Sequence, residues 1–221
     1  MEKPKEEVKD VQEEEKKEFK KEKDTIIYWS LALIIAVIIL FFAAGKFYSK
    51  EPDYETITYN NWEFTNMMDM WWFEWQNGGN TYAVPLRFNP YEVEDVPVVG
   101  SLDMEKFNSK NYVYITFDFS NESNQNVTML ALSATELTQN IASAINLTPV
   151  AACTNNLNDA CEERPIRTCD NTEEPVIYLK EGGQTAILLD KTCITVQGEG
   201  FEILKSVDRL LYHWYGIMKD D

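Results

Sequence analysis

Four cysteines are the residues with the clearest chemistry in this 221-residue sequence: Cys153, Cys161, Cys169 and Cys193. No C-x-x-C spacing occurs, so neither a zinc ribbon nor a thioredoxin-like redox pair is indicated. An even number of cysteines in an exported domain predicts two disulfides, with three possible pairings. We favour Cys153–Cys161 and Cys169–Cys193. Cys161–Cys169 has the same sequence separation as Cys153–Cys161, so the alternative stays open.

Side chains suited to acid–base or nucleophilic catalysis are few. His213 is the single histidine, and the sequence contains no G-x-S-x-G turn that would supply a serine nucleophile. Asp118 and Glu136 fall on an expected strand and an expected helix, where they could approach each other, but spacing alone does not place them in one cleft. We therefore favour a protein without catalytic activity. A hydrolase that uses Asp118, Glu136 or His213 is the alternative.

Two polar loops are candidate ligand sites. Gln197-Gly-Glu-Gly200 lies between a strand and a helix like a phosphate turn, but Ile203 replaces the third glycine and Glu199 would repel phosphate. The oxygen-rich loop from Asn155 to Glu163 lacks the spacing and central glycine of a calcium-binding loop. We predict no metal site and no cofactor.

Tryptophans cluster before the turn sequence Asn77-Gly-Gly-Asn80. Alternation places Trp71, Phe73 and Trp75 on one face of a strand, and NGGN predicts a hairpin to the next strand, which contains Pro85 at an edge or bulge. We favour an aromatic core. The functional alternative is a platform for carbohydrate or lipid, and a possible partner surface comprises Trp71, Trp72, Trp75 and His213.

The segment from Ile26 to Ala44 contains no charged residue. At about 1.5 Å per residue it is close to the hydrocarbon thickness of a bilayer, so we predict a transmembrane helix. Six lysines lie between residues 9 and 23, and only Lys46 and Lys50 follow soon after, which places the N-terminus in the cytoplasm. A cleaved signal peptide is the alternative, but its apolar region is shorter.

The net charge differs between the two sides of this uncharged segment. Residues 1–24 carry eight bases and ten acids, a net charge of −2, and the remaining 12 bases and 27 acids leave −15 outside. Such an acidic domain excludes nucleic acid as a partner. We predict a charged tail over 1–24, a transmembrane helix over 25–45, a stalk over 46–58 and an extracytoplasmic domain over 59–221.

Three N-x-[ST] sequons, at Asn121, Asn126 and Asn146, all lie on the predicted outer side and are candidate glycosylation sites.

The outer domain alternates strand and helix patterns. Strands are expected over 112–119, 149–152, 176–180, 185–190 and 193–197. A helix is expected over 128–147, with Ser133 as an alternative start because Ser133-Ala-Thr-Glu136 matches a capping box. A last helix is expected over 201–218, with a wide apolar arc and a polar face of Glu202, Ser206, Arg209, His213 and Gly216. The fold class is α/β (α+β), a layered domain with a mixed sheet and two main helices.

Five stretches in the second half of the chain carry a resemblance: Pro149-Val-Ala-Ala-Cys153, Pro165-Ile-Arg-Thr-Cys-Asp170, Val176-Ile-Tyr-Leu-Lys180, Cys193-Ile-Thr-Val-Gln-Gly-Glu-Gly200 and Asp208-Arg-Leu-Leu-Tyr-His-Trp-Tyr-Gly-Ile-Met218. They resemble an uncharacterised family of archaeal membrane-anchored proteins, and the likeness covers about residues 60–218. The resemblance implies this architecture and an archaeal envelope, and it implies no catalytic residue. We expect a single-pass cell-membrane protein whose outer domain binds another envelope or membrane component, such as an envelope protein.

Overall fold

The computed structural model describes residues 28–43, 53–117, 124–157, 159–171 and 173–219. The chain divides into two units, Met1–Asp53 and Tyr54–Asp221. In the first unit, residues 28–43 form a helix with exposed side chains. Within the described ranges, no helix combines the length and hydropathy that crossing a membrane requires. Residues 25–27, 44 and 45 of the predicted transmembrane helix lie outside these ranges.

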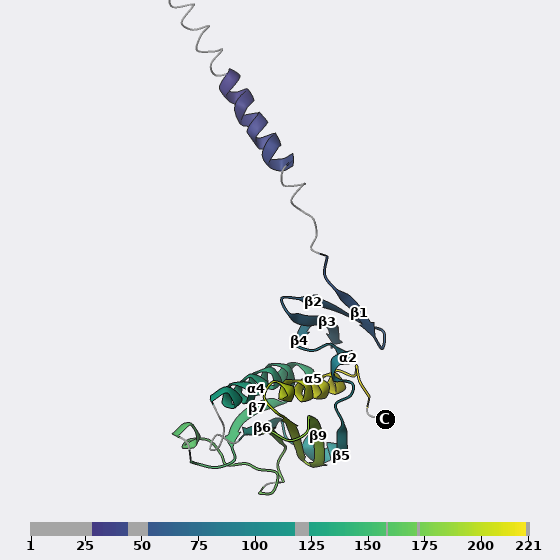
Figure 1. Ribbon diagram of the computed structural model, residues 1–221, viewed down its shortest axis with the longest axis vertical. Coiled ribbons are helices and arrows are strands. Elements are labelled where there is room, and N and C mark those ends of the chain that lie inside the picture. The colour runs from purple at the N-terminus through teal and green to yellow at the C-terminus, as the bar shows by residue number, and fades with distance from the viewer. Residues whose placement is uncertain (1–27, 44–52, 118–123, 158, 172, 220–221) are drawn as a thin grey trace, which may run out of the picture. The chain divides into compact units, whose positions relative to one another are not determined.

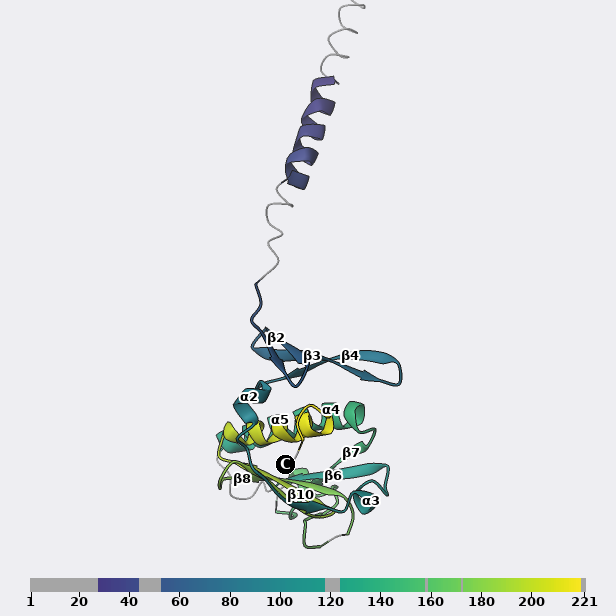
Figure 2. The same cartoon turned by 90° about the vertical axis from the view of Figure 1, so that its right-hand side faces the viewer.

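The second unit has three layers, a sheet, a pair of helices and a second sheet (Figures 1 and 2). The first sheet is an antiparallel meander of β1 (Thr56–Tyr59), β2 (Trp62–Met67), β3 (Met70–Asn77) and β4 (Asn80–Leu86). The helix layer comprises α4 (Asn124–Ala144) and α5 (Glu202–Trp214). The short helices are α2 (Pro90–Val93), α3 (Met104–Phe107) and the 3-10 helix Asp159–Cys161.

The second sheet is mixed, as the sequence predicted. Its order is β5 (Val98–Leu102), β9 (Ala186–Lys191), β10 (Cys193–Gly198), β8 (Val176–Glu181), β6 (Tyr112–Phe117) and β7 (Thr148–Cys153). Only β9 and β10 pair antiparallel; the other neighbours are parallel. The mixed sheet and the two main helices are confirmed, whereas the separate meander was not predicted. Its first strand begins at Thr56, inside the segment interpreted as a stalk.

The tryptophan hairpin that the sequence predicted is present. Trp71 pairs with Leu86, Phe73 with Val84 and Trp75 with Tyr82. The two-residue turn consists of Gly78 and Gly79, both with positive φ, which glycine adopts without strain. Pro85 lies on β4, an edge strand where its missing N–H costs no ladder hydrogen bond.

Helix α4 connects β6 to the parallel strand β7, as the strand–helix–strand pattern predicted. Leu130, Leu137 and Ile141 of the predicted stripe are buried. The helix begins at Asn124, so the alternative start at Ser133 is wrong. Ser133 is itself buried in the helix interior, so it does not act as an N-terminal cap.

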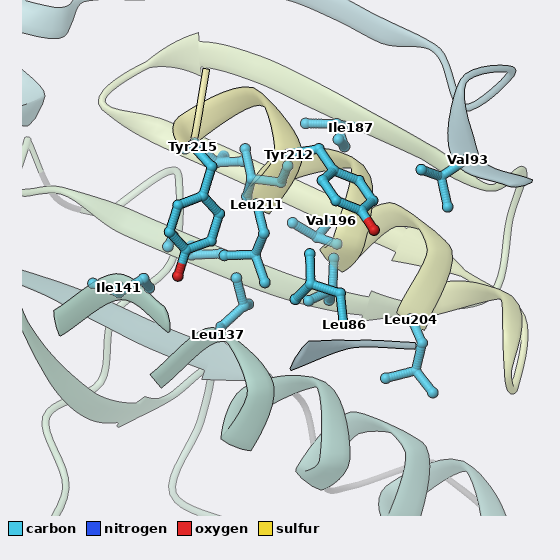
Figure 3. Packing of buried hydrophobic residues seen from close by; sticks show 14 of the residues in the cluster. Leu86, Val93, Leu137, Ile141, Ile187, Val196, Leu204, Leu211, Tyr212 and Tyr215 are labelled. Atoms are coloured by element: carbon cyan, nitrogen blue, oxygen red, sulfur yellow. The ribbon is translucent and has the colours of Figure 1, made fainter. Parts of the chain in front are cut away.

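Helix α5 lies between the two sheets. Leu204 and Leu211 are fully buried among side chains from β4, α4 and the mixed sheet (Figure 3). Tyr212 packs edge-on against Phe64 of β2, with ring centroids 5.7 Å apart. The expected polar face is therefore wrong in part: Ser206 and Arg209 are buried because a sheet covers each side of the helix.

The same helix ends earlier than the predicted Met218. Gly216 has a φ of 75°, the left-handed conformation that terminates many helices. The N–H of Ile217 donates to the Tyr212 carbonyl at 2.9 Å, and the N–H of Gly216 donates to the His213 carbonyl at 3.0 Å. These two bonds form a Schellman motif, which satisfies carbonyls of the last turn.

Both favoured disulfides are present, Cys153–Cys161 and Cys169–Cys193. The first joins the end of β7 to the 3-10 helix, and the second joins the segment before β8 to the start of β10. Together they hold the long polar segment between β7 and β8 against the mixed sheet.

We expect loss of Cys169–Cys193 to destabilise the protein more than loss of Cys153–Cys161. The pairs are 24 and 8 residues apart, so the chain-entropy model gives losses of about 3.5 and about 2.5 kcal/mol. Urea unfolding of the double variants C169A/C193A and C153A/C161A, without reductant, measures both. The reverse order, or thiols that react with Ellman's reagent in the denatured wild type, would contradict this assignment.

Candidate functional site

A groove of about 540 Å³ lies on the face of the meander that points away from the helices. Strand pairing places Thr65, Trp72 and Pro85 side by side in one row across β2, β3 and β4, and Glu74 beside Ala83. The groove is lined by Asn61, Trp62, Glu63, Thr65, Met67, Trp72, Phe73, Glu74 and Ala83. Side chains alternate between faces along a strand, so this groove and the aromatic core share the same strands.

Trp72 is the aromatic ring of the groove whose orientation is fixed by a hydrogen bond. The rings of Trp62 and Phe73 pack on each other with centroids 6.1 Å apart, and Phe73 is almost completely buried. Trp72 is half-buried, and its Nε1–H donates to the Met67 carbonyl at 3.1 Å. This hydrogen bond fixes the orientation of the ring, so the indole is a rigid flat surface before any ligand binds.

Polar groups surround this ring. The carboxylates of Glu63 and Glu74 are exposed, as is the amide of Asn61, and the hydroxyl of Thr65 is half-buried. A carboxylate only accepts hydrogen bonds, whereas an amide and a hydroxyl both donate and accept. The groove thus combines a fixed apolar surface with mainly hydrogen-bond acceptors, an arrangement suited to non-covalent binding.

The predicted partner surface requires correction. Trp71 is 7% exposed and belongs to the core, as the aromatic-core interpretation predicted. Trp75 packs against Tyr215 with ring centroids 5.2 Å apart. His213 lies in the helix layer and lines a different pocket, of about 220 Å³, beside Leu102. Of the four predicted residues, Trp72 alone lines the groove, because its neighbours on β3 point to the opposite face.

A buried acidic pair joins the meander to the helices. Asp208 of α5 is 0% exposed, and one of its carboxylate oxygens accepts from the backbone N–H groups of Arg87 and Phe88 at 2.9 and 2.8 Å. Glu136 of α4 accepts from Nε of Arg87 at 3.1 Å. Arg87 follows β4, so one residue links a strand to both helices.

The pKa values of both carboxyl groups are raised. Burial is the main cause for Asp208, whose pKa is well above its usual value, and the neighbouring charge of Glu136 raises it further. Burial also raises the pKa of Glu136, against the opposing effect of the Arg87 guanidinium. Oδ1 of Asp208 and Oε1 of Glu136 are both buried and have no hydrogen-bond partner among the described residues. Burial and the nearby carboxyl group thus favour the neutral form of Asp208 over its charged form.

Glu136 was a sequence candidate, and Asp208 was not. Asp208 is flanked one helical turn away on either side by Leu204 and Tyr212, both buried. An acid in such surroundings is a sequence signal for a buried carboxyl group, which sequence reasoning missed. Asp118, the expected partner of Glu136, lies outside the described residues.

The two loops considered as ligand sites have internal partners. Oε1 of Glu181 accepts from the backbone N–H of Gly200 at 2.8 Å, so the protein's own carboxylate occupies the turn before α5. In the other loop, Oδ1 of Asn155 accepts from the Leu157 N–H at 3.1 Å. Across the described part of the chain, no three His, Cys, Asp or Glu side chains are grouped to hold a metal ion.

The structure describes two of the three sequon asparagines. Asn146 is exposed, in the turn after α4. The backbone of Asn126 lies in α4, with its side chain outside the description, and Asn121 lies outside the described residues altogether.

Comparisons with models of protein families, with curated proteins and with solved structures find no match to this chain. The assignment of function therefore rests on the geometry of the groove and on the chemistry of the sequence.

We expect Asp208→Asn to make the free energy of unfolding less dependent on pH. The pKa values of the pair are raised on folding, so the stability that their protons provide is complete below about pH 4. It is lost as the pH rises through the raised pKa values of the folded protein. Asparagine keeps an acceptor for the Arg87 and Phe88 N–H groups but does not titrate.

Urea unfolding across a series of pH values, from about pH 4 upward, measures this effect. Asp190→Asn, at an exposed position of β9, is the matched control and should retain the wild-type slope. An Asp208→Asn variant with that same slope would show that the pair does not link protonation to stability.

Proposed function

We propose that this protein is a single-pass membrane protein whose outer domain binds another envelope or membrane component. The binding site is the groove of the meander that contains Trp72, called the tryptophan groove below. The observation that carries the binding role is the rigid indole of Trp72 in an open, polar-rimmed groove. Its orientation is set by the Met67 carbonyl, so binding orders no aromatic side chain and costs less conformational entropy.

The location outside the cytoplasm is supported by the disulfides. All four cysteines pair within the second unit, and such bonds persist in oxidising compartments, whereas cytosolic thiols are kept reduced. The uncharged segment from Ile26 to Ala44 is the proposed anchor, and the lysines before it favour a cytoplasmic N-terminus. Exposed Asn146 would be available for glycosylation on that side.

The hydrolase alternative has less support. Glu136 and His213 line separate pockets, and Glu136 is engaged by the Arg87 guanidinium. A general acid or base must contact the reacting group of the substrate. These two side chains do not converge on a common position, so the described geometry favours binding over turnover.

We expect a membrane-impermeant maleimide to label the native cysteines of intact cells only after reduction, because all four are paired on the outer side. A cysteine introduced into the tail, Glu14→Cys in a C153A/C161A/C169A/C193A background, should label only after permeabilisation. Labelling of the tail in intact cells would contradict the orientation, and labelling of native cysteines without reductant would contradict the disulfides.

We expect full-length protein purified from solubilised membranes to retain envelope components that Trp72→Ala does not retain, because this substitution removes the flat surface of the groove. Quantitative mass spectrometry of the two purifications measures the difference. Leu157→Ala, which truncates an exposed apolar side chain elsewhere, is the control. An identical set of components with Trp72→Ala would contradict binding through the groove.

A further inference from the structure

We infer that the ligand of the tryptophan groove is a neutral saccharide, which rests on the proposed role of the groove as the binding site. A sugar ring has one face of C–H groups and an edge of hydroxyl groups. The groove presents the complementary arrangement, a flat indole surrounded by hydrogen-bonding side chains.

The indole is suited to stacking for two geometric reasons. Its N–H is already engaged by the Met67 carbonyl, so the ring offers its face and no free donor. The residues beside it on the same sheet face, Thr65 and Ala83, are small, and Pro85 lies directly opposite in the pairing of β3 with β4. Small neighbours leave the ring accessible within a groove about 540 Å³ in volume.

The polar side chains of the groove favour a ligand that supplies hydrogen-bond donors. Glu63 and Glu74 can only accept hydrogen bonds when ionised. Sugar hydroxyls are donors that a carboxylate pairs with well, and the amide of Asn61 and the hydroxyl of Thr65 add groups of both kinds. Hydrogen bonds to a charged acceptor contribute more than neutral ones.

Charge and desolvation exclude two other classes of ligand. A phosphate, sulfate or uronate would meet two carboxylates on a domain with a net charge of −15 and would be repelled. An acyl chain would cover the same two carboxylates without offering a hydrogen bond, and burying them unpaired is costly. A neutral, hydroxylated ligand avoids both penalties.

A cationic peptide is the remaining competitor, since Trp72 and two carboxylates would attract a positive charge. Cation recognition typically encloses the charge between several aromatic faces. Here Phe73 is almost completely buried and the half-buried Trp62 ring packs edge to face with it, so the groove offers the Trp72 face and part of Trp62 but no enclosing set of rings. The shape of the groove therefore favours the saccharide, and the charge of its rim provides the means to distinguish the two.

The test uses full-length protein in detergent micelles with two probes. One is a panel of neutral oligosaccharides of glucose, mannose, galactose and N-acetylglucosamine, together with neutral glycans released from the host's own membranes. The other is a lysine-rich peptide. Isothermal titration calorimetry measures affinity at low and high salt.

We expect at least one neutral saccharide to bind, with an affinity that is independent of salt. Trp72→Ala should weaken binding by about tenfold or more, and Trp72→Tyr, which keeps a flat face, by much less. Glu63→Gln and Glu74→Gln keep an acceptor oxygen and should each weaken it by only about threefold. Leu157→Ala should bind like the wild type.

A second variant and a measurement of thermal unfolding distinguish loss of binding from loss of the fold. Ala83→Gln leaves Trp72 in place and extends a neutral side chain over the groove, so it should reduce binding like Trp72→Ala. Thermal unfolding of each variant shows whether the fold is retained, and Ala83→Gln decides the result if Trp72→Ala does not fold.

The saccharide assignment is overturned if no neutral saccharide binds, or if binding survives both Trp72→Ala and Ala83→Gln. It is also overturned if only the lysine-rich peptide binds, with affinity lost in Glu63→Gln and at high salt. Failure of the proposed function is distinguishable: Trp72-dependent capture from membrane extracts that survives periodate oxidation of the glycans rejects the sugar and retains the binding role.

Discussion

Helix α5 is buried around most of its circumference, and this constraint determines the layering of the domain. Ile203 and Tyr212 are both fully buried, although they lie on opposite sides of the helix axis. One sheet covers only one side of a helix, so two sheets are needed to remove both of these side chains from water. The meander and the mixed sheet supply the two sides (Figure 2).

Complete burial of α5 brings Asp208 into the interior, where a lone carboxylate would be strongly disfavoured. Two backbone donors just after β4 offset part of this cost, and the raised pKa of Asp208 favours its neutral form. Arg87 contributes its backbone to one acid and its side chain to the other. The pair thus connects the meander to the helices. This structural role accounts for its burial better than a catalytic role would.

The position of the meander decides which tryptophans are available for binding. Trp71 and Phe73 must face α5, because the aromatic core there includes Tyr212 and Tyr215. Trp72, between them in sequence, therefore points outward beside Thr65 and Pro85. The groove is in this sense a consequence of core packing on the opposite face. The disulfides act on the other sheet, where they hold the polar segment between β7 and β8.

Local patterns were sufficient for much of the fold. Alternation and the NGGN turn predicted the hairpin and the shared face of Trp71 and Phe73, and the favoured disulfides and the apolar stripe of α4 were correct. These features depend on near neighbours in the sequence, where periodicity and turn chemistry dominate. Gly216, which follows α5 in the left-handed conformation, is also a local signal for a helix end. The apolar residues Ile217 and Met218 continue the helical pattern beyond it, so the sequence predicted a longer helix.

Tertiary structure alone decided the rest. The polar residues Ser206 and Arg209 indicated an exposed face of the last helix, but a second sheet covers it. Asp208 and Arg87 are 121 residues apart, so no local pattern could pair them. Sequence identified a cluster of tryptophans, yet only the packing of β3 on α5 determined that Trp71 is core and Trp72 is surface. The physical reason is that side-chain type indicates what can be buried, whereas the neighbouring layers determine what is buried.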